Sequence, residues 1–119
     1  ESEESPGIEG LGLLKGKVLK IDHQIQEKIK LPHVTWNKVH LCGEQKIKLM
    51  ENQESKNLYY FVHSYAVILA DNEIKYANTN YQKVKFVSMI QKDNIFGVQF
   101  HPEKSGHQGL TLLNNFLSF

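Results

Sequence analysis

The chain has 119 residues, of which 40% are hydrophobic and 23% are charged, and its formal net charge is +1. That length allows one domain with a modest core, and the balanced charge excludes the basic stripe of a nucleic-acid-binding protein and the charged block of a disordered tail. The single cysteine, Cys42, excludes an intrachain disulfide framework and favours a reducing, cytoplasmic setting, and no apolar run has the length of a membrane helix.

The first half of the chain contains two stretches with the pattern of strands. Apolar residues and lysines alternate over residues 17–21, as in a half-buried strand. Residues 33–41 (HVTWNKVHL) follow Pro32 and are rich in β-branched and aromatic residues, which predicts a second strand. Residues 44–53 have an ambiguous pattern, and we expect at most one short helix there.

The second half is richer still in β-formers. Residues 58–69 (LYYFVHSYAVIL) are the densest such run, which predicts a well-buried strand that turns near residues 63–65. Alternating or β-rich segments predict three further strands, over residues 73–78, 84–91 and 95–100. We expect a turn at residues 93–94, between the last two of them.

The pattern changes to a helical period at the C-terminal end. One helical face is predicted to be apolar, and it carries Leu110, Leu113, Phe116 and Leu117. Ser105 and Gln108 have the spacing of a capping box, which places the helix start near Ser105. Many strands and one helix indicate either an α+β domain or a parallel sheet whose covering helices lie elsewhere.

His101, Pro102 and Glu103 stand where the last predicted strand ends. A proline holds the residue before it in an extended conformation, so His101 is presented at the strand end. A carboxylate near one imidazole nitrogen fixes the tautomer and leaves the other nitrogen free as a general base. The alternative is structural: His101 ends the strand and Glu103 interacts with the dipole of the following helix. Spacing alone leaves both interpretations open.

A nucleophile for this base is not evident in the chain. The sequence contains neither a G-x-S-x-G nor a G-x-C-x-G elbow. Cys42 has apolar neighbours and no glycine two residues before it, which is more typical of a small core residue than of a reactive thiol. Trp36, the single tryptophan, is equally compatible with a core residue and an interface anchor. His33 and His40 lie seven residues apart without a cysteine pair or an H-x-x-x-H motif, so we expect no metal site.

Four segments together resemble the class I glutamine amidotransferases. They are "GLGLLKGKV" (10–18), "LPHVTWNKV" (31–39), "YYFVHSYAV" (59–67) and "GVQFHPEKS" (97–105). The resemblance covers essentially the whole chain in order. Within that family the set is most similar to the branch that forms the glutaminase subunit of imidazole glycerol phosphate synthase, in histidine biosynthesis.

The resemblance implies a flavodoxin-like α/β fold, of which this chain, strand-rich with one terminal helix, would be the C-terminal portion. It implies hydrolysis of glutamine to glutamate and ammonia by a cysteine on a nucleophile elbow, which we expect upstream of Glu1 together with the oxyanion loop. His101 would be the general base and Glu103 its orienter. His63, Ser64 and Tyr65 would line the glutamine pocket. No cofactor or metal is implied, and the 119 residues alone would be inactive.

The resemblance also implies a heterodimer in which ammonia passes to a cyclase partner with a β/α-barrel fold. Residues expected at the partner interface or the ammonia passage are His33, Trp36, Asn37, Tyr60 and Lys104. Thr35 stands where the family usually has glycine, which puts a contact of that interface in question. Two alternatives stay open: a paralogous amidotransferase that feeds a surface-sugar pathway, and a non-catalytic module that only binds a partner.

Overall fold

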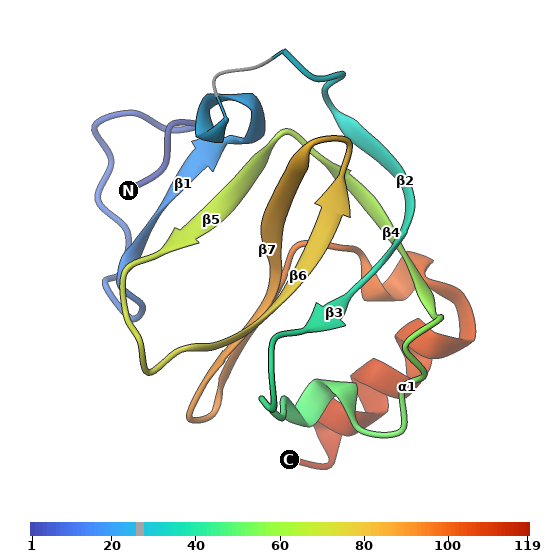
Figure 1. Cartoon of the computed structure of the whole chain (residues 1–119). Helices are drawn as coiled ribbons and strands as arrows, with labels where there is room; N and C mark the ends of the chain where they lie inside the picture. Colours follow the sequence, from blue (N-terminus) through green and yellow to red (C-terminus); the bar gives the residue numbers. More distant parts are fainter. Residues whose placement is uncertain (26–27) are drawn as a thin grey trace.

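The computed structural model describes residues 1–25 and 28–119, which form a six-stranded sheet, a two-stranded ribbon and a C-terminal helix (Figure 1). The strands of the sheet are β1 (Gly16–Lys20), β3 (His40–Leu41), β5 (Tyr65–Leu69), β6 (Lys75–Tyr81), β7 (Val84–Lys92) and β8 (Ile95–Val98). The ribbon consists of β2 (His33–Lys38) and β4 (Leu58–His63). The helical segments are η1 (Ile21–Gln24), η2 (Lys48–Met50), η3 (Pro102–Lys104) and α1 (Gly106–Leu117).

The sheet is antiparallel in each pairing between its named strands. Its order is β1-β5-β7-β6-β3, and β8 pairs with β7 on the edge that β7 shares with β5. The register of β5 and β7 is given by Val67 opposite Val87. A bulge at Ala77 and Asn78 interrupts the longer pairing of β6 with β7. The strands predicted over residues 73–78, 84–91 and 95–100 are therefore confirmed as β6, β7 and β8.

The predicted run 58–69 supplies a strand to both sheets. It bends at Ser64, so that β4 pairs with β2 in the ribbon while β5 pairs with β1 in the large sheet. This bend is the turn that the sequence predicted. The other predicted run, 33–41, is also confirmed, but it is divided at the buried Val39 into β2 and β3. Of residues 44–53, only Lys48–Met50 are helical.

Aromatic rings form the part of the core that lies beneath the ribbon. Phe61 of β4 contacts Phe86 of β7 and Phe100, with ring centroids 5.8 and 5.6 Å apart. Tyr59 packs on Phe100 at 4.6 Å. These side chains are almost wholly removed from water, which stabilises the fold through the hydrophobic effect. Because Phe100 is buried among them, the core holds the residue directly before His101.

The C-terminal helix is confirmed, and its buried face is not the predicted apolar stripe. The buried residues of α1 are Gly109 and Leu112, which with Ser105 follow the spacing i, i+4, i+7. The predicted stripe is exposed instead, at 59% for Leu110 and 78% for Leu117. The helix packs against η2, η3 and β4, and those contacts select a face one residue away, about 100° around the helix.

The predicted capping box is also wrong. Ser105 occupies the N-cap position, but its side chain makes no capping hydrogen bond. The side-chain amide of Gln108 donates to the carbonyl of Leu58 on the neighbouring strand. Both side chains thus serve contacts between distant segments of the chain instead of the helix terminus. The prediction of a strand-rich α/β structure with one terminal helix is confirmed. None of the helices in residues 1–25 and 28–119 is long and apolar enough to cross a lipid bilayer.

Candidate active site

His101 lies in the short connection between β8 and α1. Its backbone is extended, with φ of −100° and ψ of 99°, as the proline after it requires. Its N–H donates to the carbonyl of Tyr60 on β4 over 2.9 Å. Pro102 then begins η3, which carries Glu103 and Lys104. The loop is thus tied to the ribbon on one side and continues directly into the helix on the other.

The imidazole of His101 and the carboxylate of Glu103 lie together, with Nδ1 2.9 Å from Oε1. Because a carboxylate only accepts hydrogen bonds, the proton is on Nδ1 and Nε2 is the nitrogen available as a base. A hydrogen bond from its own backbone N–H, and then the bond to His101, lower the pKa of Glu103. The side chains are 38% and 58% exposed, respectively, so the pair faces the surface.

Ser105 holds the loop in place, a role that the sequence did not indicate. Its hydroxyl donates to the carbonyl of His101 over 2.5 Å and accepts from the backbone N–H of Tyr60 over 3.0 Å. The residue is fully buried. One side chain therefore joins the histidine loop to β4, four residues away at one end and 45 at the other. A serine four residues after the histidine of His-Pro is the only local signal for it.

Tyr60, one of the predicted interface residues, lies next to His101, and Trp36 lies against Tyr60. The rings of Trp36 and Tyr60, which are register partners in the ribbon, meet edge to face at 5.9 Å. The ring of Tyr60 lies 6.4 Å from that of His101. Trp36 is 45% exposed, and Lys104 is exposed on η3. The structure therefore brings together four predicted residues from distant segments of the chain, namely Trp36, Tyr60, His101 and Lys104.

The predicted pocket residues His63, Ser64 and Tyr65 form the bend between β4 and β5. The Nδ1 atom of His63 lies 2.9 Å from the carbonyl oxygen of Tyr65. The carbonyl of Ser64 accepts from the backbone N–H of Ile21, also over 2.9 Å. All three residues are partly buried. The bend is thus held by contacts on both sides of Ser64.

His33 and Asn37, which were expected at the partner interface, differ in their exposure. His33 has no exposed surface, because the rings of Phe61, Tyr81 and Phe86 surround it. A direct contact between this side chain and a partner does not fit that placement. Asn37 is partly exposed, and its side-chain amide donates to the carbonyl of Asn80 over 2.8 Å.

Cys42 fits neither alternative from the sequence completely. It follows β3 and is partly exposed, so it is not a core residue. Its Sγ accepts a hydrogen bond from the side-chain amide of Asn78 over 3.1 Å. It does not belong to the His101 loop.

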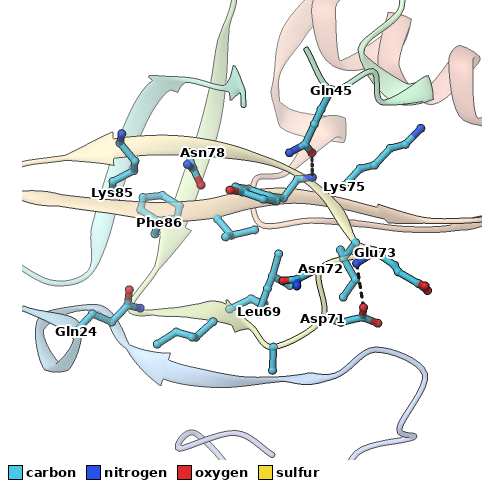
Figure 2. A pocket seen from close by; sticks show the side chains of 16 residues that line it. Gln24, Gln45, Leu69, Asp71, Asn72, Glu73, Lys75, Asn78, Lys85 and Phe86 are labelled. Carbon is cyan, nitrogen blue, oxygen red and sulfur yellow. Dashed lines mark hydrogen bonds between the residues drawn. The ribbon is translucent and has the colours of Figure 1, made fainter. Parts of the chain in front are cut away.

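A groove of about 940 Å³ is lined by β5, β6, β7 and the connection between β5 and β6 (Figure 2). Figure 2 shows polar and charged side chains around it, among them Gln45, Asp71, Lys75 and Lys85. Two hydrogen bonds brace its wall, from Tyr76 N–H to Gln45 and from Glu73 N–H to Asp71. None of the predicted catalytic, substrate or interface residues lines this groove. It is therefore separate from the candidate site.

The structure thus places a histidine–glutamate pair after a strand of a strand-rich α/β fold, which is the arrangement expected of a class I glutamine amidotransferase. The model of the family "Glutamine amidotransferase class-I" matches residues 11–118, and the chain belongs to that family. This confirms the resemblance that the four sequence segments indicated.

Among individual relatives, the chain is 48% identical over 116 residues to imidazole glycerol phosphate synthase subunit HisH of Pyrococcus furiosus, covering 98% of this chain and 56% of that protein. It is 45% identical over 115 residues to the protein of the same name from Pelagibacter ubique, covering 97% and 53%. The chain thus spans about half the length of the curated relatives it matches.

The fold also resembles a solved structure. A crystal structure from Thermoplasma acidophilum, of a protein assigned to the GMP synthases, matches with a TM-score of 0.65 over 87% of this chain and 47% of that chain. At 19% identity this likeness shows the fold alone. It supports the predicted α/β amidotransferase fold.

Proposed function

We propose that this chain is the C-terminal portion of the glutaminase subunit of an imidazole glycerol phosphate synthase, in the cytoplasm. The full protein hydrolyses glutamine to glutamate and passes the ammonia to a cyclase subunit in histidine biosynthesis. The observation that carries the proposal is the His101–Glu103 contact of 2.9 Å, in a chain that is 40–48% identical to HisH subunits along nearly its whole length.

The chemistry follows from the orientation of that pair. Nε2 of His101 takes the proton of a cysteine thiol, and the thiolate attacks the carboxamide carbon of glutamine. The imidazolium, stabilised by Glu103, returns the proton to the leaving nitrogen, so ammonia departs and a thioester remains. His101 then deprotonates water, which cleaves the thioester to glutamate and restores the thiol. The cysteine is supplied by a segment upstream of Glu1, because no elbow motif occurs in these 119 residues.

We assign the glutamine pocket to the bend at His63, Ser64 and Tyr65. The bend lies on the same strand as Tyr60, whose carbonyl holds the His101 loop, so pocket and base share one support. Two hydrogen bonds hold the bend, one from the N–H of Ile21 to Ser64 and one between the His63 side chain and the carbonyl of Tyr65. A backbone that positions a substrate needs this kind of rigidity.

The partner surface is assigned to the outer face of the ribbon, next to the His101 loop. Apolar side chains are exposed there, and no residue in 1–25 or 28–119 covers them fully: Val34 is 50% exposed, Trp36 45% and Val62 41%. A contiguous apolar surface of this kind marks a protein–protein contact. We propose that Trp36, Tyr60 and Lys104 meet the β/α-barrel cyclase there and border the ammonia passage. Asn37, whose side chain lies on the other face of β2 with His33, borders that surface through its exposed part.

A glutamate-release assay tests the proposal. The full-length protein is combined either with the cyclase of the same genome or with the synthase partner of a surface-sugar pathway. We expect release to rise by at least tenfold with the cyclase. A rise with only the surface-sugar partner would assign the protein to that paralogous branch. No release with either partner, from a protein that binds one of them, would support the non-catalytic module.

A further inference from the structure

Two histidines face each other inside the protein, on neighbouring strands of the ribbon. His33 of β2 and His63 of β4 are register partners, and Nδ1 of His33 lies 2.9 Å from Nε2 of His63. Two nitrogens at that distance must share one proton, so one ring donates and the other accepts. The contacts at the two outer nitrogens decide which ring is the donor.

The contact at the His63 end fixes one proton. Nδ1 of His63 lies 2.9 Å from the carbonyl oxygen of Tyr65, and a carbonyl can only accept. The proton on His63 is therefore at Nδ1. In a neutral ring Nε2 is then the acceptor, and the hydrogen bond between the rings must come from Nδ1–H of His33.

The contact at the other end leads to the same order independently. The side-chain oxygen of Asn37 accepts from the N–H of Lys38 over 2.8 Å, and its NH₂ group donates to the carbonyl of Asn80 over 2.8 Å. The same Nδ2 atom lies 3.4 Å from Nε2 of His33, within reach of its second hydrogen. Nε2 of His33 is therefore an acceptor, which again places its proton at Nδ1.

The surroundings favour neutral rings. His33 is fully buried, and its ring packs on Tyr81 at 4.1 Å and on Phe61 at 5.0 Å. Burial, and then repulsion from His63, lower the pKa of His33 to about 4. Burial also lowers the pKa of His63. Both rings are thus uncharged near neutral pH, and the hydrogen bonds all run in one direction, from Asn37 to Tyr65.

We infer that Asn37, His33 and His63 form a one-directional hydrogen-bond chain that positions the Ser64–Tyr65 bend, with His33 as a positioning residue for the glutamine pocket. The inference rests on the proposed function for the role of that bend. It gives the buried His33 a part in glutamine binding and links a strand of the partner surface to the pocket.

The tautomers of the two rings test the chain directly. Nitrogen-15 NMR of the full-length wild-type protein at pH 7.5, with His33→Asn and His63→Gln used for assignment, distinguishes Nδ1–H from Nε2–H. We expect both rings to be neutral with the proton on Nδ1. A neutral Nε2–H form of either ring, or a positive charge on either, would overturn the inference. The measurement needs no catalysis.

Two substitutions of His33 separate positioning from packing in glutaminase assays of the full-length protein with its cyclase. His33→Phe keeps the ring volume but removes the donor to His63, whereas His33→Asn keeps a donor at the place of Nδ1 but loses volume. Positioning predicts that KM for glutamine rises at least tenfold in His33→Phe and less than threefold in His33→Asn, with smaller changes in kcat. The exposed His40→Phe is the matched control and leaves KM unchanged.

The opposite order of the two variants, with KM raised more by His33→Asn than by His33→Phe, would show that His33 only fills space and would overturn the positioning role. Failure of the proposed function is recognised separately, because wild-type protein would then release no glutamate whatever the tautomers are. Should His33→Phe not fold, the wild-type tautomers still decide the inference.

Discussion

The backbone N–H of His101 donates to the carbonyl of Tyr60 over 2.9 Å, and the hydroxyl of Ser105 bridges the same two residues from the other side. The position of the proposed base is therefore set by β4. The C-terminal end of the same strand leads into the bend assigned to the glutamine pocket. Changes at this junction should affect the rate of hydrolysis more than its substrate affinity.

Replacing Ser105 by alanine tests that junction. The Tyr60 N–H loses its acceptor inside the protein, which should lower the free energy of unfolding by about 1–3 kcal/mol. The His101 loop is also released, so kcat for glutamine hydrolysis should fall by about tenfold or more with little change in KM. Urea unfolding and steady-state kinetics of the full-length protein measure the two effects. Ser118→Ala, on an exposed hydroxyl at the far end of the same helix, should change neither.

The close contact of α1 with η3 predicts that replacing Gly109 by alanine destabilises the protein, although alanine favours a helix. A Cβ atom on Gly109 would lie 2.0 Å from the carbonyl oxygen of Pro102, closer than atoms can approach. Helix propensity alone favours Gly109→Ala by about 1 kcal/mol, but the clash with backbone should outweigh it and destabilise the protein by about 1–3 kcal/mol. Thermal unfolding compares it with Leu110→Ala. A higher melting temperature for Gly109→Ala would contradict the close packing of the helix on the loop.

Sequence patterns predicted the strands because side-chain alternation is a local property of the chain. The extended backbone at His101 was predictable for the same reason, since Pro102 imposes it. The packed face of α1, the bridging role of Ser105 and the burial of His33 were not. Each depends on which distant segment of the chain packs against the residue. β4 is such a segment in all three cases, since it contacts α1, bonds to Ser105 and pairs with the strand of His33.

The exposure of Trp36 predicts its effect on assembly. Trp36→Ala should weaken binding of the proposed cyclase partner at least tenfold, because a half-exposed tryptophan on an apolar face is the typical anchor of an interface. Stability of the free protein should change little, and Trp36→Phe should retain most of the affinity. Calorimetric titration with the cyclase measures this. Equal affinities for the wild type and Trp36→Ala would place the interface elsewhere.

The buried histidine pair predicts loss of stability in acid. An unfolded histidine takes up a proton near pH 6.5, whereas the pKa of His33 in the folded protein is about 4. Between these values the unfolded state binds more protons, so stability is complete above pH 6.5 and falls as the pH is lowered toward 4. His33 alone should contribute up to about 3 kcal/mol to this loss.

Urea unfolding at several pH values measures that loss in the full-length protein. The groups that face His33 are the rings of Phe61, His63, Tyr81 and Phe86 and the amide of Asn37. Replacing His33 by phenylalanine should therefore flatten the dependence on pH, while His40→Phe should leave it unchanged. Equal slopes for wild type and His33→Phe would mean that His33 is not the titrating group.

The most direct test of the account is glutamate release by the full-length protein with its cyclase, compared among wild type, His101→Ala and Glu103→Gln. With a base and an orienting carboxylate in these positions, we expect His101→Ala to lower kcat by at least about a thousandfold and Glu103→Gln by at least about tenfold. Glu54→Gln, a change at an exposed ion pair with Lys56, should be silent. A His101→Ala enzyme within threefold of wild type would contradict the role of this histidine in the chemistry.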